Sequence, residues 1–281
     1  MRPAPSGSAL AVTPGRILTT FSAFIRRDWI SARSYRLPFV IELTSNVFGL
    51  VLFYYLSRLV DRVGVRGQGL QQGYFAFAIV GQALLRIVQS GLGSFAGKLR
   101  TEQTTGTLEA LLAAPAPPSL LILASAAYDM LFAWTSAAIL LAGAILLGMD
   151  LHVSVTSAAG LLVAVPAVVV LFVALGVAVA AFIMVFKQGA SLLGLITSGL
   201  ALLAGVYFPV ELFPGALGAV AKALPFTWGV QVLRAGLLTG QLQLGRLGLL
   251  VISAGCALPM SLWLFRAAVD RARRSGTLAQ Y

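Results

Sequence analysis

Long apolar runs separated by short polar segments make up most of the chain. Six of these runs reach the ~20 residues that a helix needs to cross the hydrocarbon core of a bilayer. They cover roughly residues 37–60, 73–96, 119–148, 155–186, 189–208 and 244–265. The third and fourth runs are longer than a bilayer requires, so we expect these helices to tilt or project. The pattern predicts an all-α membrane protein whose six transmembrane helices lie within residues 37–268.

The segment before the first run has a different pattern. Apolar residues recur at helical spacing between Ile17 and Trp29, and arginines fill the positions between them. This predicts an amphipathic helix over residues 15–36 that lies in the headgroup layer, with a short soluble helix as the alternative. Residues 1–14 are rich in Pro, Ser, Gly and Ala and predict a disordered tail. Residues 269–281 predict a basic tail.

The composition supports a membrane protein and excludes several other classes. Of the 281 residues, 59% are hydrophobic and 10% are charged, whereas soluble domains have about 25% charged residues. The net charge of +11 comes from cations at the ends of the apolar runs, so it indicates membrane topology and not a nucleic-acid partner. Cys256 and His152 are the single residues of their types, which argues against an internal disulfide and a histidine metal site. Residues 8–12 are too short for the apolar core of a signal peptide.

The distribution of cations predicts the orientation. Six runs place both termini on one side of the membrane. If that side is the cytoplasm, 13 Lys and Arg residues lie inside and 6 outside, with Arg86 within a run. Cytoplasmic segments carry an excess of such residues. We therefore expect a multi-pass protein of the inner membrane with both termini and residues 98–118 in the cytoplasm.

Residues 209–240 are apolar but interrupted by Pro209, Pro214 and Pro225. The helical pieces between the prolines, 215–223 and 226–239, are too short to cross a bilayer. We expect re-entrant or interfacial helices on the outer side, between the fifth and sixth runs. A plain long loop is the alternative.

Residues 98–118 form a polar stretch between the second and third runs. Residues 102–113 predict about three helical turns that end before Pro115. Glu102 and Glu109 are seven residues apart and share one face of such a helix. From the residues alone, this segment is either an amphipathic docking helix with an acidic face or an ordinary solvated loop helix.

Two motifs resemble those of ABC-2 type transporter permeases. One is the run from Glu102 to Pro115, EQTTGTLEALLAAP. The second begins with GVYFP at Gly205 and continues to Arg234, and its marker residues are Tyr207, Phe208, Pro209, Pro214, Pro225 and Arg234. The resemblance extends from the amphipathic helix to the last run. The first run is more similar to drug- and lipid-exporting members than to polysaccharide exporters.

The resemblance implies the membrane subunit of an exporter for a drug-like, lipid or glycolipid substrate. Such a subunit would form a homodimer among membrane lipids and contact separate cytoplasmic ABC ATPase subunits. The residues implied in coupling to the ATPase are Glu102, Gly106, Thr107, Leu108 and Glu109. The short helices would close the outer exit.

The same reading implies that this chain is non-catalytic. It would bind no cofactor itself, and ATP and magnesium would bind the partner. The phosphate-binding motif G-x-x-x-x-G-K-[ST] is missing, because the nearest match, at 93–98, has its glycines one residue too close and leucine after the lysine.

Ionisable and aromatic residues within the runs suggest further sites. Glu42 is expected near the inner interface. Arg86 and Asp129 are each ~15–17 Å from the inner end of their runs, which predicts an ion pair; the alternative is that each faces a water-filled pathway. Four aromatic residues near the outer ends of the first two runs form either an interfacial belt or a lining for an amphipathic substrate. They are Tyr54, Tyr55, Phe75 and Phe77.

Two other classes of function remain as alternatives. Secondary transporters and channels often have internal repeats and helices broken at the midplane, but here no repeat is visible and the broken segment is expected at the outer end. A membrane-embedded enzyme needs His, Asp, Glu or Ser side chains clustered at one depth. One histidine and scattered carboxylates argue against that class.

Overall fold

The computed structural model describes residues 14–34, 37–63, 73–104, 118–186 and 190–274. All secondary structure in these ranges is helical, which confirms the predicted all-α membrane fold. The helices are α1 (Pro14–Ser34), α2 (Leu37–Val63), α3 (Gly73–Thr104), α5 (Pro118–Ser125), α6 (Ala127–Leu146), α7 (Val155–Phe186), α8 (Ala190–Leu203), the 3-10 helix η1 (Val210–Leu212), α9 (Gly215–Ala223), α10 (Pro225–Arg234), the π-helix η2 (Ala235–Thr239) and α11 (Leu244–Arg274).

Five of the described helices are long and apolar enough to cross a membrane. They are α2, α3, α6, α7 and α11. The pair formed by α9 and the stretch Pro225–Thr239 would be a sixth candidate, but it is bent by 74°. The predicted fifth run, 189–208, is helical only as far as Leu203. With 14 residues, α8 is shorter than the ~20 that a bilayer needs.

The predicted third run is also interrupted. It consists of α5 and α6, with a turn at Ala126 between them. The apolar residues continue across this turn, so the hydropathy of the run does not reveal the break. Only Ala127–Leu146 is long enough to span the bilayer. The run 155–186, in contrast, is one helix, α7, as predicted.

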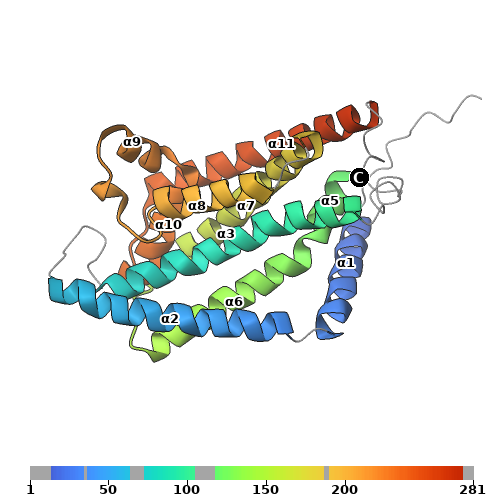
Figure 1. Cartoon of the computed structure of the whole chain (residues 1–281). Coiled ribbons are helices and arrows are strands. Elements are labelled where there is room, and N and C mark those ends of the chain that lie inside the picture. The colour runs from blue at the N-terminus through green and yellow to red at the C-terminus, as the bar shows by residue number, and fades with distance from the viewer. Residues whose placement is uncertain (1–13, 35–36, 64–72, 105–117, 187–189, 275–281) are drawn as a thin grey trace, which may run out of the picture.

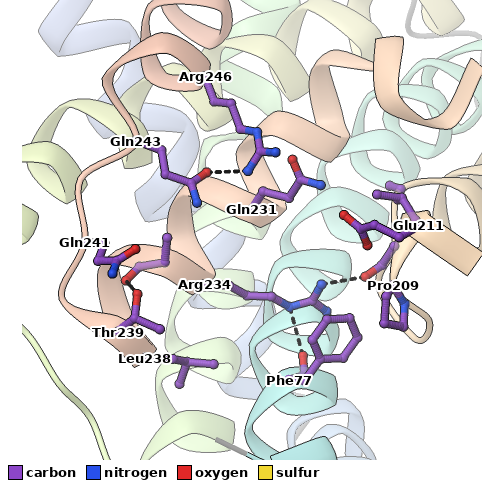
Figure 2. A pocket seen from close by; sticks show the side chains of 14 residues that line it. Phe77, Pro209, Glu211, Gln231, Arg234, Leu238, Thr239, Gln241, Gln243 and Arg246 are labelled. Atoms are coloured by element: carbon purple, nitrogen blue, oxygen red, sulfur yellow. Dashed lines mark hydrogen bonds between the residues drawn. The ribbon is translucent and has the colours of Figure 1, made fainter. Parts of the chain in front are cut away.

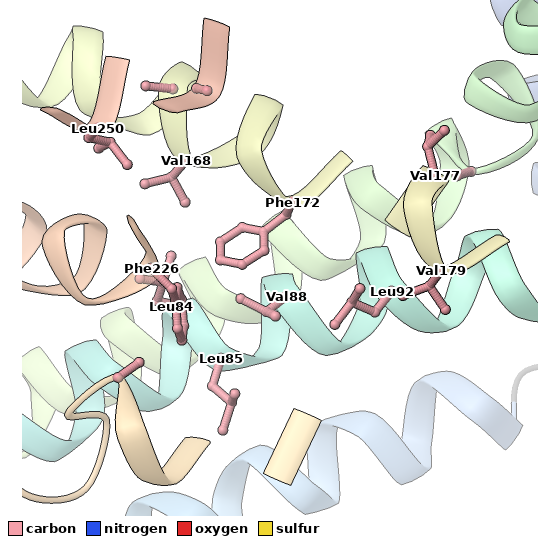
Figure 3. Packing of buried hydrophobic residues seen from close by; sticks show 14 of the residues in the cluster. Leu84, Leu85, Val88, Leu92, Val168, Phe172, Val177, Val179, Phe226 and Leu250 are labelled. Carbon is pink, nitrogen blue, oxygen red and sulfur yellow. The ribbon is translucent and has the colours of Figure 1, made fainter. Parts of the chain in front are cut away.

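Helix α3 lies at the centre of the bundle and contributes side chains to two apolar cores. The larger core joins α3 with α7, α10 and α11, and Figure 3 shows Phe172 beside Val88 and Phe226. The rings of Phe172 and Phe226 meet edge to face, with their centroids 4.9 Å apart. The smaller core joins α3 with α2 and α6 through residues such as Leu50 and Leu140. The helices on one side of α3 therefore share the larger core with it, and those on the other side share the smaller one.

The two ends of the bundle carry different short helices. Helix α1 lies across one end, next to α5 and at the same end as the C-terminal part of α11, whereas α9 and α10 lie at the opposite end (Figure 1). The ring of Trp29 on α1 contacts that of Tyr128 on α6 at 6.4 Å between centroids. Both ends of the described chain are thus at the same end of the bundle.

Candidate functional site

The chain loses regular helix after α8, within an apolar part of the sequence. Residues 204–208 form turns and bends, and Gly205 has a φ of +72°, which only glycine adopts without strain. A Cβ atom at this position would also lie 2.8 Å from the side chain of Val210. Backbone carbonyls freed by such a break need hydrogen-bond donors, because hydrocarbon provides none.

Arg234, the last residue of α10, supplies these donors. Its Nη1 donates to the carbonyl of Gly205 at 2.6 Å, and its Nη2 donates to that of Val206 at 2.7 Å. Its Nε donates to the carbonyl of Phe77 on α3 at 3.0 Å, as Figure 2 shows. The guanidinium lies over the Phe77 ring, 3.5 Å from its centroid, and the residue is only 8% exposed. One side chain therefore joins α10 to α3 and to the unwound end of α8.

The guanidinium reaches α3 only because position 81 is glycine. A Cβ atom on Gly81 would overlap Nη2 of Arg234 and would lie 2.5 Å from the carbonyl oxygen of Val206. The backbone of α3 thus approaches the turn after α8 more closely than any side chain at this position would allow.

We expect Gly81→Ala to destabilise the protein by about 1–3 kcal/mol, which is the usual cost of overpacking a filled core. The measurement is the thermal midpoint of the purified protein in detergent. Gly93→Ala is the matched control, because it lies on the same helix and a Cβ there would meet nothing within 4 Å. Equal midpoints for the two variants would show that the close approach at Gly81 does not matter for stability.

A second contact holds the same turn against α3 and α2. The Tyr207 hydroxyl donates to Oε1 of Gln82 at 2.9 Å. The Tyr207 ring is stacked on that of Phe53 on α2, with 5.9 Å between centroids. The turn after α8 is therefore fixed from two directions, by Arg234 and by Tyr207.

A cavity of about 270 Å³ lies beside Arg234. It is bounded by η1, by α10 and η2, and by the first turn of α11, as seen in Figure 2. Its polar lining residues are Glu211, Gln231, Arg234, Thr239, Gln241, Gln243 and Arg246. Arg234 belongs to a predicted motif, but none of the three glutamines or Arg246 was predicted as part of a site.

Arg86 forms an ion pair with Glu42 and not with Asp129. Its Nη1 donates to Oε1 of Glu42 at 2.6 Å. Its Nη2 donates to Oγ of Ser45 at 3.2 Å. The same Glu42 oxygen accepts a hydrogen bond from Ser136 at 2.7 Å, so this cluster joins α2, α3 and α6.

The predicted Arg86–Asp129 pair was wrong because depth fixes a residue's height but not the direction in which it points. The predicted depth of the two residues was nearly right. The Ser90 hydroxyl, one turn from Arg86, donates to the backbone carbonyl of Asp129 at 3.1 Å. Arg86 instead points toward α2. The signal that was missed is the group of polar positions on α2 at Glu42, Ser45 and Asn46, spaced so that they share one face.

The comparison with known families gives one match. Residues 19–238, more than three quarters of the chain, match the family model described as ABC-2 type transporter. The chain belongs to the ABC-2 type transporter family. A search among curated proteins found no matching relative. The chain is therefore a transport permease component, and the family match includes α10 and Arg234 but ends before α11.

Most residues predicted to couple this ABC-2 permease to an ATPase lie outside the described residues. These are Gly106, Thr107, Leu108 and Glu109. Glu102 is in the last turn of α3, and its side chain is outside the described part as well. Their role in coupling stays a prediction.

The prolines of the second ABC-2 motif mark the boundaries of the short helices. Pro209 precedes η1, and Pro214 precedes α9 with an extended backbone. Pro225 is the first residue of α10, where the missing N–H costs no hydrogen bond. The sequence thus located both α9 and α10 correctly, although the end of the second piece, Ala235–Thr239, is a π-helix.

The four predicted aromatic residues are not equivalent. Tyr54 contacts the rings of Tyr55 and Phe75, with 5.6 and 6.0 Å between centroids. The guanidinium of Arg58 lies over the Tyr54 ring at 4.6 Å. Phe77 differs because it is 3% exposed and its ring lies beneath the guanidinium of Arg234. It therefore belongs to the floor of the cavity beside Arg234 and not to the aromatic group around Tyr54.

Proposed function

We propose that this ABC-2 permease is the membrane subunit of an ATP-driven exporter. In this proposal ATP and magnesium bind separate cytoplasmic ABC ATPase subunits. The permease works as a homodimer in the inner membrane, with both termini and residues 98–118 in the cytoplasm. Its substrate is amphipathic, of the drug-like, lipid or glycolipid kind, and it leaves from the cytoplasm or the inner leaflet. Family membership supports the association with an ATPase.

The observation that carries the proposal is the continuity of α3. This helix runs for 32 residues, or about 48 Å at 1.5 Å per residue, without a proline or a break. Near one end its Phe77 carbonyl is bonded to Arg234 of α10. At the other end it leads directly into the predicted coupling segment at Glu102. A displacement of that segment would therefore be transmitted by a rigid element to the short helices at the far end of the bundle.

Polar residues on one face of α3 support a route for an amphipathic substrate. Gln82, Arg86 and Gln89 are spaced four and three residues apart, so their side chains follow one stripe along the helix. Polar side chains at membrane depth usually face the interior of a bundle or a wet cavity and not lipid. Gln89 is exposed in the single chain, which is consistent with a stripe that borders a path.

The exposed surface of α2 supports contact with lipids and with a second copy. Large apolar side chains are exposed along this helix from one end to the other. Examples are Phe39, Val47, Phe48, Leu52 and Leu59. Such a surface needs an apolar environment. In the proposal, acyl chains cover one part of it and the second permease covers the rest.

The experiment that tests the proposal is co-purification with a co-expressed candidate ABC ATPase. We expect wild-type permease to retain the ATPase and Glu109→Arg to lose most of it, because a reversed charge would face the basic residues that the acidic helix is proposed to contact. Asp150→Arg is the matched control, since Asp150 is exposed in the loop between α6 and α7, which the proposed topology places on the outer side. Equal retention by both variants would contradict the assignment of the docking helix. Transport into vesicles without ATP would instead support a secondary transporter.

A further inference from the structure

The cavity beside Arg234 places opposite charges on different walls. The floor carries the guanidinium of Arg234, and the first turn of α11 contributes Arg246. The carboxylate of Glu211 belongs to η1, on the side of Arg234 away from Gln241 in Figure 2. With two cations and one anion, the lining has a formal charge of +1. A group that carries both charges would meet a complementary partner on each wall.

The polar side chains of the cavity have unused hydrogen-bonding capacity. Arg246 has one hydrogen bond in the described structure, from Nη1 to Oε1 of Gln243 at 2.7 Å, although a guanidinium has five N–H donors. The side-chain amides of Gln231 and Gln241 make no hydrogen bond to the described part of the chain. The cavity therefore presents donors from one arginine and two amides, together with the acceptor oxygens of Glu211.

The size of the cavity and its surroundings restrict the ligand. Its volume of about 270 Å³ is below the ~300–1,000 Å³ of sites that hold a whole drug-sized ligand. Two leucines adjacent in sequence to lining residues are strongly exposed: Leu212 on η1 at 63%, and Leu244 at the start of α11 at 71%. A polar headgroup fits inside, and an attached apolar chain can lie against these side chains.

We propose that this cavity binds a zwitterionic headgroup with a phosphodiester and a primary ammonium. The phosphate oxygens accept hydrogen bonds from Arg246 and the neighbouring amides, and the ammonium donates to Glu211. A purely anionic headgroup is disfavoured because it would place a negative charge near Glu211. A quaternary ammonium is disfavoured because it has no N–H to donate. The proposal does not require ATP-driven export, since it concerns binding to the permease alone.

The test is lipid retention by the purified, delipidated full-length chain in detergent, measured by native mass spectrometry. Phosphatidylethanolamine, phosphatidylglycerol and phosphatidylcholine with identical acyl chains are offered at equal concentration. We expect phosphatidylethanolamine to be retained preferentially. Arg246→Gln should weaken its binding by about tenfold, because a charge-assisted hydrogen bond is lost. Glu211→Gln should remove the preference over phosphatidylglycerol.

Two control variants change the same charges outside the cavity. Lys222→Gln removes an exposed cation from α9, and Asp150→Asn removes an exposed anion between α6 and α7. Both control variants should retain the wild-type preference for phosphatidylethanolamine. Arg246 and Glu211 are exposed, so their variants should keep the wild-type thermal midpoint, which separates lost binding from lost folding.

A competition experiment distinguishes a membrane lipid from a small soluble zwitterion. Glycerophosphoethanolamine has the headgroup without acyl chains. If it displaces the lipid, the headgroup alone is sufficient; if it does not, while the variants still lose binding, the ligand is the intact lipid. Equal retention of the three lipids by the wild type, or equal losses in the cavity and control variants, would overturn the proposal. Neither result would bear on the ATPase co-purification.

Discussion

Replacing Arg234 with leucine should leave little folded protein. The change removes the donors to the carbonyls of Gly205 and Val206, which lie in a non-helical segment packed inside the bundle. Each buried polar group left without a partner costs about 1–3 kcal/mol. The two together amount to roughly 2–6 kcal/mol, a large fraction of the ~5–15 kcal/mol that stabilises a typical folded protein. Arg234→Lys should be less severe, because an ammonium reaches fewer of the acceptors.

The measurement is the yield of monodisperse protein after solubilisation, together with the thermal midpoint of what remains. Lys222→Leu is the matched control, because it also exchanges a cation for leucine but on the exposed face of α9. We expect the control to have the yield and the thermal midpoint of the wild type. A wild-type yield and midpoint for Arg234→Leu would mean that water or other groups satisfy these carbonyls.

A double-mutant cycle on Arg86 and Glu42 should reveal strong coupling. Either single change, Arg86→Leu or Glu42→Leu, leaves the partner charge at membrane depth, which is more costly than losing both. Because Glu42 is 32% exposed in the single chain, solvent reduces the effect. We therefore expect a coupling energy of about 1–3 kcal/mol, with the double variant less destabilised than the sum of the single variants.

The corresponding cycle on Arg86 and Asp129 gives the contrast. Without a direct contact between the two side chains, the destabilisations should add to within about 0.5 kcal/mol. Thermal midpoints of all variants in one detergent supply both comparisons. Strong coupling of Arg86 to Asp129, with none to Glu42, would favour the partner expected from depth over the one in the structure.

The sequence predicted the helices best where the chemistry of the residues changes abruptly. The boundaries of α7 agree because polar residues enclose a continuous apolar run. The boundaries of α9 and α10 agree because prolines restrict the backbone on either side. The end of α8 was missed, since residues 204–209 are as apolar as the helix before them. Hydropathy reports whether a residue can enter a membrane and not whether its backbone is helical there.

The site could be predicted only in part. Arg234 was identified through its place in a motif, but its role depends on acceptors at Phe77, Gly205 and Val206, which the fold brings together from separate helices. Gly81 gave no signal of its own among the many glycines of the chain. The sequence placed Arg86 at about the right depth in the membrane. The direction of its side chain toward α2, however, is set by the packing of α2, α3 and α6. Contacts of this kind are a property of the packed fold.

The position of α3 in both apolar cores has a consequence for biosynthesis. Its partners α2 and α6 are synthesised near it, so the smaller core can assemble early, because chains fold from the N-terminus during synthesis. Its other face is covered first by α7, and the larger core is completed only when α10 and α11 have left the ribosome. Until then, the carbonyls that Arg234 will bind lack this donor. A chain that stops before residue 234 therefore keeps unpaired carbonyls inside an apolar bundle, and we expect membrane quality control to act on such an intermediate.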